Sequence, residues 1–598
     1  MKKPFVFEVS WEVCNKVGGI HTVLESKAEY IKAQYGEGYF LVGPYLGQSS
    51  EIVFEAKEMP DFLKSIVKEL ENLGIRLFYG TWLIDAEPQV ILVDFTGETA
   101  NINQTKTKLW DWYQVDSLNS DFEFDEPVAW SFAVGKMIEA LKKGPLAKEE
   151  IVLQCHEWMA GAPILYLKKQ DVKISSIFTT HATFMGRVLA SKGVDFYKSL
   201  NEIDAESKAY EFGIYAKFLL EKAIALNATV LTTVSDITAS EAKAFYGRKP
   251  EVILENGLNI NHFSDTEKAT FRHTEFKNII REFLMYFFFP HYKFNLDKAL
   301  IYFLVGRYEM HAKGIDTFID ALGELNRRLK NQHSDKTVVA FVAVPSGSYT
   351  LKSELIQSKS VYLNIKQSID SEIDDIYKRL VRACTGEFDI TGQNILKQEI
   401  RNKVATKTKL FKRTGDPLLI THNIGDESSD QILGRFKEQG LFNREEDRVK
   451  VVYFPVYLNG ADGLLNLNLY DFMSGSHLGV FPSFYEPWGY TPLEAGALSV
   501  PSITTDLSGF GLAVNALGGK KKFPGTYVVE RSKFDYKKEV KDLASLMHKF
   551  LTFDKDERMI SRIHANQTAR NFDWKILVRK YFDAHEMALK IKGSKVKK

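Results

Sequence analysis

The chain has 598 residues, of which 45% are hydrophobic and 26% charged, and its 78 lysines and arginines nearly balance its 77 aspartates and glutamates. This length exceeds what one hydrophobic core supports, and no linker rich in proline, serine or glycine divides the chain, so we expect two large packed domains. The balanced charge argues against a nucleic-acid partner, because such a protein needs a basic excess to displace counterions from phosphates.

Cysteine usage and hydropathy favour a cytoplasmic protein. Cys14, Cys155 and Cys384 lie far apart and show no paired spacing, so neither a disulfide framework nor a structural zinc site is indicated. The first residues do not resemble a signal peptide. The most apolar window, Phe283 to Phe289, is far shorter than the roughly 20 residues that a membrane span needs, so we expect no membrane partner.

In chain order, short β-branched or aromatic runs alternate with turns and helix-period segments, which is typical of parallel sheets with crossover helices. The first half predicts strands at Phe5–Val9, Tyr39–Val42, Gln89–Val93, Ile151–Gln154, Ser176–Thr180, Val230–Thr233 and Glu251–Leu254. After a helical stretch, Thr274 to Phe288, the second half predicts strands at Ala299–Val305, Val338–Val344, Leu418–Thr421, Val449–Phe454, Leu478–Phe481, Ser502–Thr504 and Tyr527–Val529. We predict an α/β fold in which two doubly wound Rossmann-like domains, residues 1–296 and 297–572, face a cleft between them.

Residues 346–416 lie between the second and third strands of the second domain and are too many for a simple crossover, so we expect an inserted helical pair. The apolar residues Tyr362, Ile365, Ile369, Ile373, Ile376 and Leu380 follow a helical spacing and predict one stripe on a long charged helix. A second, more basic helix is predicted from Gln393 to Phe411. This pair can pack on its own domain or on another subunit, and the pattern leaves both open.

Residues 573–598 predict a final amphipathic helix, Trp574 to Ile591, followed by a basic tail. The apolar face of this helix includes Trp574, Leu577 and Tyr581, so it must dock on the rest of the protein, and we expect it to cross back over the cleft. The tail is interpreted as a solvated, frayed end.

Two motifs of the first domain lie where strands are predicted to end. Lys16-Val17-Gly18-Gly19 leads into a helix, so its amides can approach an anion, although a structural turn without a ligand is the simpler alternative. His156 and His181 each follow a predicted strand. The residue four positions after His156 is an alanine, which rules out a His-Glu-x-x-His zinc motif, and a buried, satisfied histidine is the alternative for each.

Two motifs of the second domain suggest chemistry on a phosphate ester. Arg307 and Lys313 follow its first strand and could clamp a diphosphate, or could be exposed cations that bind nothing specific. Glu486 precedes a proline and lies beside a helix N-terminus, where a carboxylate suits a cationic transition state next to a phosphate leaving group. Thr491 and Glu494 fit the N-cap and N3 positions of that helix, so a capping box is the structural alternative for Glu494.

Several blocks of sequence occur in order along the chain: Glu8-Val9-Ser10-Trp11-Glu12-Val13, Lys16-Val17-Gly18-Gly19-Ile20, His156-Glu157-Trp158, Thr180-His181-Ala182-Thr183 with Gly186-Arg187, Asn256-Gly257-Leu258-Asn259, Gly306-Arg307-Tyr308 with Lys313-Gly314, Tyr485-Glu486-Pro487-Trp488-Gly489-Tyr490-Thr491-Pro492, Pro501-Ser502-Ile503-Thr504-Thr505 and Leu507-Ser508-Gly509-Phe510-Gly511. In these blocks the chain resembles the eukaryotic-type glycogen (starch) synthases, glycosyltransferase family 3. The resemblance covers nearly the whole chain.

The resemblance implies a GT-B fold, an active site in the interdomain cleft, no metal ion or other cofactor, and transfer of glucose from UDP-glucose to the non-reducing end of glycogen with retention of configuration. It implies that Glu486 lies at the reacting sugar, that Arg307 and Lys313 hold the diphosphate, and that His181 contacts the transferred glucose. The implied substrate-binding residues are Lys16, Gly18, Gly19, His156, Arg187, Asn256, Trp488, Gly489, Tyr490, Thr491 and Glu494.

The resemblance also bears on regulation and partners. Eukaryotic members carry a dense arginine run before the last helix, whereas this chain has only Arg558 and Arg562 there, beside Asp556 and Glu557, so we expect weak or absent activation by glucose 6-phosphate. The insertion at 346–416 matches the family's oligomerisation element and implies a homotetramer. A glycogenin-like primer protein is a further implied partner.

Two other interpretations stay open. The chain could be a related GT-B transferase that uses ADP-glucose or a small sugar acceptor, which donor choice would reveal. It could instead be a catalytically silent glycogen-binding scaffold, although Glu486, His181, Arg307 and Lys313 are all present. No sequence block resembles the Schiff-base lysine region that a phosphorylase needs.

Overall fold

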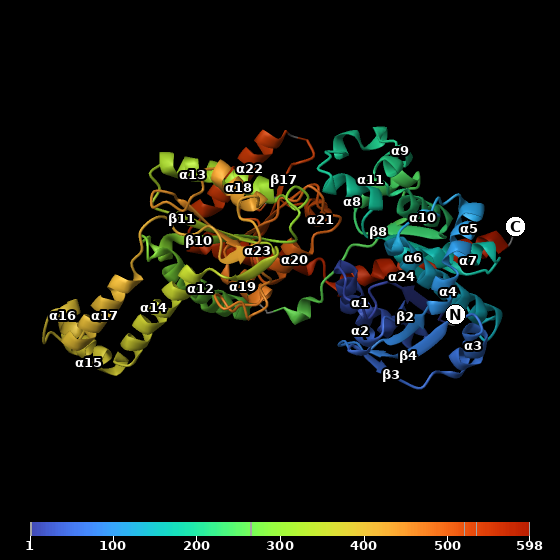
Figure 1. The fold of residues 1–598 in the computed structure, drawn as a ribbon, viewed down its shortest axis with the longest axis horizontal. Helices are drawn as coiled ribbons and strands as arrows, with labels where there is room; N and C mark the ends of the chain where they lie inside the picture. Colours follow the sequence, from blue (N-terminus) through green and yellow to red (C-terminus); the bar gives the residue numbers. More distant parts are fainter. Residues whose placement is uncertain (1–2, 264–265, 520, 534, 597–598) are drawn as a thin grey trace.

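The computed structural model describes residues 3–263, 266–519, 521–533 and 535–596, which form two α/β domains side by side along the long axis of the molecule (Figure 1). Each domain is built on a mainly parallel sheet with helices on both faces, as predicted. Strands that are covered on both faces consist of continuous apolar runs, which is why they were recognisable in the sequence.

The sheet of the first domain has nine strands in the order β3-β4-β5-β2-β1-β6-β7-β8-β9. They are β1 (Phe5–Val9), β2 (Tyr39–Pro44), β3 (Phe54–Ala56), β4 (Arg76–Trp82), β5 (Gln89–Asp94), β6 (Ile151–His156), β7 (Ser175–Thr180), β8 (Val230–Thr233) and β9 (Val252–Ile253). All the strands predicted here are present. The pattern did not predict β3 and β4, which add an antiparallel edge where one face stays partly exposed.

Helices cover both faces of this sheet. They are α1 (Gly19–Tyr35), α2 (Gln48–Glu51), α3 (Asp61–Glu71), α4 (Thr96–Ala100), α5 (Ile102–Tyr113), α6 (Phe122–Lys143), α7 (Glu157–Lys169), α8 (Phe184–Ser191), α9 (Ala205–Glu211), α10 (Tyr215–Asn227) and α11 (Asp236–Tyr246). Because α1, α7 and α8 begin shortly after β1, β6 and β7, the carboxyl ends of these strands and the starts of these helices meet at one edge of the sheet. This edge is where ligands bind in doubly wound folds.

The sheet of the second domain has six parallel strands in the order β14-β11-β10-β15-β16-β17. They are β10 (Ala299–Val305), β11 (Thr337–Ala343), β14 (Val449–Phe454), β15 (Leu478–Val480), β16 (Ser502–Thr505) and β17 (Thr526–Val529). The strand predicted at 418–421 is wrong. Only Ile420 makes an isolated bridge there, and the chain then turns into β13 (His422–Ile424), which pairs with β12 (Ser348–Leu351) in a separate ribbon.

The helices around this sheet are α12 (Thr266–Phe288), α13 (Ile315–Asn331), α18 (Gln431–Glu438), α19 (Leu469–Gly475), α20 (Tyr490–Ala497), α21 (Gly509–Leu517), α22 (Tyr536–Thr552) and α23 (Lys555–Arg570). Helix α12 packs Phe283 and Phe287 against Phe303 and Phe341 of the second sheet. In packing terms α12 therefore belongs to the second domain, although our boundary at residue 296 assigned it to the first.

The insertion forms an arm of helices that projects from the second domain (Figure 1). It contains α14 (Ser353–Asp370), α15 (Ile373–Cys384), α16 (Gly392–Ile395) and α17 (Gln398–Phe411). The single long helix predicted for its first half is wrong, because the chain leaves helical geometry at Glu372 with φ −120° and ψ 12°. An apolar spacing that continues across so short a break cannot reveal it.

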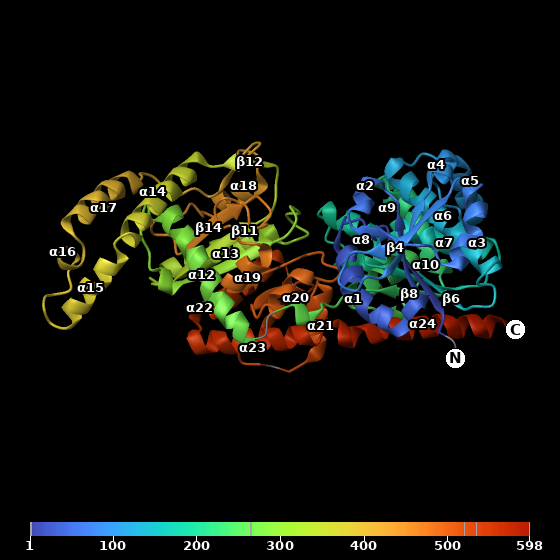
Figure 2. The same cartoon turned by 90° about the horizontal axis from the view of Figure 1, so that it is seen from below.

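Helix α24 (Trp574–Val596) extends from the second domain and lies along the first, where it contacts α1 and β7 (Figure 2). The Trp574 indole is buried, donates to Ser26 Oγ at 2.7 Å, and faces Gly257, where a Cβ would come within 2.8 Å of the ring. The last two residues of the basic tail lie outside the described residues. Among the helices that the structure describes, none has the length and hydropathy of a membrane span.

Candidate active site

An ion pair between Lys313 and Glu486 lies at the carboxyl edge of the second sheet. Lys313 Nζ donates to Glu486 Oε2 at 2.7 Å, and Ser483 Oγ donates to the same oxygen at 3.3 Å. Both charged side chains are about one fifth exposed, at 20% and 21%. The Glu486 backbone is extended, as predicted, because it bridges to Ser508.

The loop that carries Lys313 depends on a glycine. Gly314 has φ +66°, and a Cβ on it would lie 1.9 Å from the carbonyl oxygen of Pro482. A residue without a side chain is therefore required where the loop after β10 crosses the loop that carries Glu486. This crossing brings the cation and the carboxylate together from segments far apart in the sequence.

A pocket of about 540 Å³ opens beside this pair. Its polar wall contains Arg307, Lys313 and Thr491, and its apolar wall is formed by Ala343, Pro345, Val456, Tyr457, Leu458 and Leu469. A smaller hollow shares Lys313 and Thr491 with this pocket and reaches Glu486. Two cations and an apolar wall thus line the pocket, and a carboxylate lines the neighbouring hollow. No sequence pattern pointed to Tyr457, which lies on an irregular loop.

Helix α20 begins two residues earlier than predicted, and the proposed capping box is wrong. Gly489, with φ +114°, is the N-cap, and no side chain caps the helix. A non-glycine residue at position 489 would be strained, and its Cβ would lie 2.9 Å from Ser508 Oγ. The first-turn amides of Tyr490 and Thr491 consequently have no acceptor within the helix and lie next to the pocket. Such amides can bind an anion.

Glu494 pairs with Tyr470 and not with the N-cap amide that a capping box would provide. Its carboxylate accepts a hydrogen bond from Tyr470 Oη at 2.9 Å. Burial raises the pKa of Glu494, and the Tyr470 hydrogen bond opposes that rise. Trp488 packs on Phe510 and Phe572, and its indole nitrogen has no hydrogen-bond partner within the described residues.

The two predicted histidines lie in contact at the carboxyl edge of the first sheet. His156 Nδ1 and His181 Nε2 are 2.8 Å apart, and the second nitrogen of His156 lies 2.7 Å from Glu8 Oε1. Burial lowers the pKa of both histidines, so both are neutral. Both ring nitrogens of His156 are engaged inside the protein, and its side chain is 1% exposed, so this side chain is not placed to contact a substrate.

The loop that carries His181 is held by Glu157 of its own domain and by Tyr485 of the second domain. Glu157, with φ +65°, accepts the amides of His181 at 2.8 Å and Ala182 at 3.0 Å through one oxygen. From the second domain, the Tyr485 hydroxyl donates to the Thr183 carbonyl oxygen at 3.4 Å. The residue before Glu486 therefore contacts the loop of His181, which places both predicted residues at one domain junction.

Two carboxyl groups buried beneath this loop have raised pKa values. Glu241 accepts from Thr183 Oγ1 at 2.5 Å and from Tyr197 Oη at 2.7 Å, and Glu221 accepts from the Phe184 amide at 2.9 Å. Burial raises the pKa of Glu221 to about 8 and that of Glu241 to about 7. The second carboxylate oxygen of Glu221 has no partner among the described residues, which fits a neutral acid.

The remaining predicted residues of the first domain surround the cleft more loosely. The Gly18 amide donates to Glu12 Oε2 at 2.8 Å, so the anion at this helix end is a carboxylate of the protein itself. Lys16 and Gly19 are exposed, as is Arg187, on which the charges of Glu157 and Glu309 act. Asn256 is buried, and its side-chain oxygen has no partner within the described part of the chain.

Arg558 and Arg562 belong to a larger group of cations than the sequence of α23 indicates. Helix α12 places Lys277 and Arg281 beside them, and burial together with these charges lowers the pKa of Lys277 to about 8. Burial lowers the pKa of Arg562 to about 10, and its Nη1 has no partner among the described residues. Counting arginines on one helix missed this group, because two helices far apart in the sequence form it.

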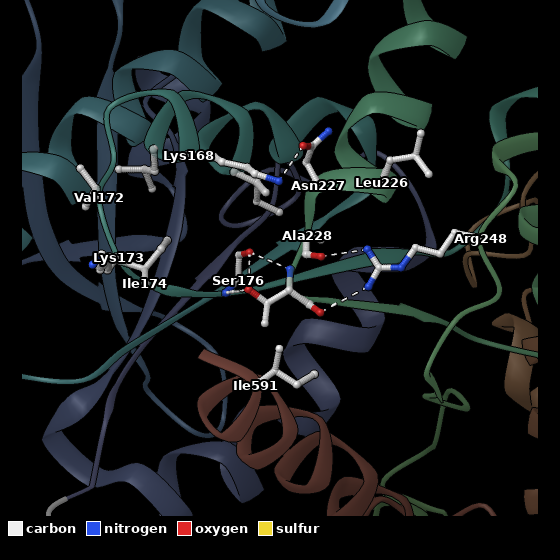
Figure 3. A pocket seen from close by; sticks show the side chains of 13 residues that line it. Lys168, Val172, Lys173, Ile174, Ser176, Leu226, Asn227, Ala228, Arg248 and Ile591 are labelled. Atoms are coloured by element: carbon white, nitrogen blue, oxygen red, sulfur yellow. Dashed lines mark hydrogen bonds between the residues drawn. The ribbon is translucent and has the colours of Figure 1, made fainter. Parts of the chain in front are cut away.

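A separate pocket of about 500 Å³ lies at the opposite edge of the first sheet, near the end of α24 (Figure 3). Two of its three cations are already used by the protein: Lys168 donates to Asn227 at 2.9 Å, and Arg248 donates to the Ala228 carbonyl at 2.8 Å. It lies at the amino ends of β7 and β8, whereas ligands bind at the carboxyl ends. The described residues contain no group of three or more side chains that could hold a metal ion.

Comparison with known proteins agrees with this geometry. The family model for glycogen synthase matches residues 8–595. The chain belongs to the glycogen synthase family. It is 36% identical to the glycogen [starch] synthase of Neurospora crassa over 99% of this chain and 84% of that protein. It is 34% identical to the liver glycogen [starch] synthase of Mus musculus over 98% of this chain and 83% of that protein.

Among solved structures, the catalytic domain of starch synthase IV from Arabidopsis thaliana, bound to ADP and acarbose, matches with a TM-score of 0.49 and 12% identity over 98% of this chain and 100% of that chain. Sucrose-phosphate synthase from Thermosynechococcus elongatus matches with a TM-score of 0.48 and 13% identity over 98% of both chains.

Replacing Glu221 by glutamine should flatten the pH dependence of stability. The folded protein keeps a proton on Glu221 up to a pKa of about 8, whereas an unfolded chain loses it near pH 4.3, so the free energy of unfolding should fall between these values as pH rises. Glu221→Gln mimics the neutral acid. We expect it to gain at least about 1 kcal/mol on the parent between pH 5 and pH 8, measured by urea unfolding. The exposed Glu69→Gln variant is the control, and equal slopes for Glu221→Gln and the parent would contradict the assignment.

Proposed function

We propose that this chain elongates glycogen by transferring glucose from UDP-glucose to the non-reducing 4-hydroxyl of an α-1,4-glucan, with retention of configuration. The observation that carries the proposal is the Lys313 and Glu486 pair beside a pocket with a second cation, Arg307, in a chain of the glycogen synthase family. No metal ion or other cofactor has a role in it.

The charges of the pocket match those that develop in the reaction. The bond between the anomeric carbon and the diphosphate breaks, the acceptor 4-hydroxyl forms a new bond to that carbon, and the hydroxyl proton passes to the departing diphosphate. Arg307, Lys313 and the amides at the start of α20 stabilise the negative charge that grows on the leaving group. The carboxylate of Glu486 and the backbone carbonyl of His181 stabilise the positive charge on the sugar.

The apolar wall of the pocket is the proposed place of the nucleotide base. Tyr457 and Leu469 offer a ring and an aliphatic side chain between which a planar base can lie, at the end of the pocket where the side chains are apolar. We propose uracil as the base. Adenine, from ADP-glucose, is the alternative, and comparing the two donors distinguishes them.

Glu486→Gln should abolish most of the activity while leaving the fold intact. It removes the negative charge beside the sugar but keeps the shape, so we expect kcat to fall by about 10³-fold, the scale of losing a preorganised electrostatic contact. The measurement is incorporation of labelled glucose into glycogen from UDP-glucose and from ADP-glucose.

The matched control is Glu438→Gln, an exposed carboxylate on α18, which should keep parental rates. Equal activity of Glu486→Gln and the control would contradict the site. Glycogen binding by the parent without transfer from either donor would favour the scaffold interpretation.

We also propose that the helical arm assembles the chain into a homotetramer. Apolar side chains on one side of α15 are exposed: Ile373 is 54%, Tyr377 66% and Leu380 40% exposed. They project from an arm rather than packing on the domain, which is typical of a helix that pairs with another subunit. A glycogenin-like primer protein stays a prediction from the resemblance.

Placing charges on this exposed face of α15 should dissociate the assembly. We expect the double variant Tyr377→Asp with Leu380→Asp to have a lower molar mass than the parent in light scattering coupled to size-exclusion chromatography. Each subunit would otherwise have to bury two carboxylates at a contact where the parent buries two apolar side chains. Lys378→Asp, on the same helix but outside this exposed apolar face, should keep the parental mass. A parent that is already monomeric would refute the proposal.

The cation group of α12 and α23 is proposed to bind a phosphate-bearing effector such as glucose 6-phosphate, in contrast to the weak or absent response expected from α23 alone. Arg562 is the central residue, since it is buried without an acidic partner among the described residues and its Nη1 is unused. A dianionic phosphate would neutralise several of these cations at once.

Arg562→Ala should lower the affinity for this effector at least about tenfold, the scale of one lost hydrogen bond between charged groups. The measurements are UDP-glucose transfer at low donor concentration and thermal stability, each as a function of glucose 6-phosphate. Arg570→Ala, an exposed residue at the end of the same helix, is the control. No response of the parent in either measurement would restore the original expectation.

A further inference from the structure

His181 ends a chain of buried hydrogen bonds that begins at Glu8. His181 Nε2 and His156 Nδ1 are 2.8 Å apart, and His156 Nε2 and Glu8 Oε1 are 2.7 Å apart. Glu8 and His156 are each 1% exposed, and His181 is 8% exposed. Strands β1 and β6 carry the first two residues, and the third follows β7, so adjacent strands hold the chain in register.

Glu8 is the charged end of this chain. Its carboxylate forms a buried ion pair with Lys27 and accepts a hydrogen bond from Tyr39 Oη at 2.6 Å. Burial alone would raise the pKa of Glu8, yet the charge of Lys27 and the hydrogen bond from His156 outweigh it and hold this pKa below its usual value. An ionised carboxylate can only accept hydrogen bonds.

The ionised carboxylate determines the direction of every hydrogen bond in the chain. His156 must donate to Glu8 through Nε2, and because burial keeps its ring neutral, its Nδ1 carries only a lone pair. His181 must then donate to that lone pair through its own Nε2. Burial keeps His181 neutral as well, so its Nδ1 is unprotonated. Within the described residues, this nitrogen has no hydrogen-bond partner.

We infer that Glu8 and His156 are positioning residues that hold His181 in one tautomer, with Nε2 protonated and Nδ1 available to accept a hydrogen bond from a hydroxyl of the transferred sugar. The inference rests on the proposed function for the identity of the substrate. It assigns His156 to the support of His181 rather than to the substrate. In the other tautomer, His181 Nδ1 would be a donor to which a hydroxyl could bind only as an acceptor, and Nε2 would turn a lone pair toward the lone pair of His156 Nδ1.

A neighbouring but separate group of buried hydrogen bonds provides a matched control. Gln154 pairs in register with Glu8, donates to Thr179 Oγ1 at 3.1 Å, and accepts through its side-chain oxygen from His585 of α24 at 2.8 Å. Tyr35 donates to the other nitrogen of His585 at 2.8 Å. This hydrogen bond is buried to the same degree but does not reach His156. Tyr35→Phe therefore removes one buried hydrogen bond without changing the tautomer of His181.

The tautomer is measured directly on the whole protein by two-bond ¹H–¹⁵N correlation spectra of a sample labelled at histidine, with His181→Gln used to assign the signal. The expected result is an unprotonated Nδ1 and a protonated Nε2 for His181 in the parent and in Tyr35→Phe. The opposite tautomer, or an imidazolium at neutral pH, would overturn the inference. This measurement needs no activity.

Two substitutions of His156 test whether the tautomer matters for transfer. Asparagine places its side-chain oxygen near the position of Nδ1 and can still accept from His181, whereas glutamine reaches toward Glu8 and leaves His181 Nε2 without an acceptor. We expect kcat with UDP-glucose to fall about 10- to 100-fold in His156→Gln, the scale of one lost hydrogen bond in a desolvated site, with the donor KM changed less than about threefold. His156→Asn should recover most of this loss, and Tyr35→Phe should keep the parental kcat.

The outcomes separate the inference from the proposed function. Equal kcat losses in His156→Gln, His156→Asn and Tyr35→Phe would show a structural role only and overturn the inference. A parent that transfers no glucose from either donor but shows the expected tautomer would instead overturn the proposed function.

Discussion

One apolar cluster spans both domains, and the position of the active site depends on it. It combines strand residues of the first domain, such as Val6 and Ile177, with Trp488 and Phe510 of the second and with Trp574 of α24. Burial of so many large side chains in one cluster makes the relative placement of the domains a consequence of packing rather than of a linker. The carboxyl edges of the two sheets meet beside this cluster, so the loops of His181 and Glu486 are neighbours.

The two sides of the junction are electrostatically different. The second domain supplies three charged side chains that are at least partly exposed, Arg307, Lys313 and Glu486. Each is paired with another charged side chain of the protein, and a charged group of a substrate can replace that partner. The first domain supplies neutral polar groups, of which His181 is one, above fully buried charges such as Glu8. In the proposed reaction, preorganised cations suit the leaving diphosphate and fixed dipoles suit the developing oxocarbenium ion.

Groups remote from the cleft are connected to it through the same helices. Helix α23, which carries Arg562, packs on α20, whose first turn faces the donor pocket, and it leads directly into α24. Helix α24 in turn places Tyr581 and His585 against the network of Glu8 and Gln154. A ligand or a subunit contact that shifts α23 would therefore bias both halves of the site, through rigid elements rather than through a flexible loop.

The sequence by itself determined the α/β class and nearly all of the buried strands, and it predicted Glu486, Lys313, Arg307 and His181 at the carboxyl ends of strands. These features follow from local patterns, because a strand covered on both faces must be apolar throughout and because polar residues after such strands must meet at one edge. Only the tertiary structure decided which groups pair. Gly489 rather than Thr491 caps α20, since the crossing at Ser508 requires a positive φ there. The cations of α12 join Arg562, and Glu8 reaches His156, over separations that no spacing rule covers. Hydrogen bonds and charges act over a few ångströms in space, and folding alone brings such distant residues within that range.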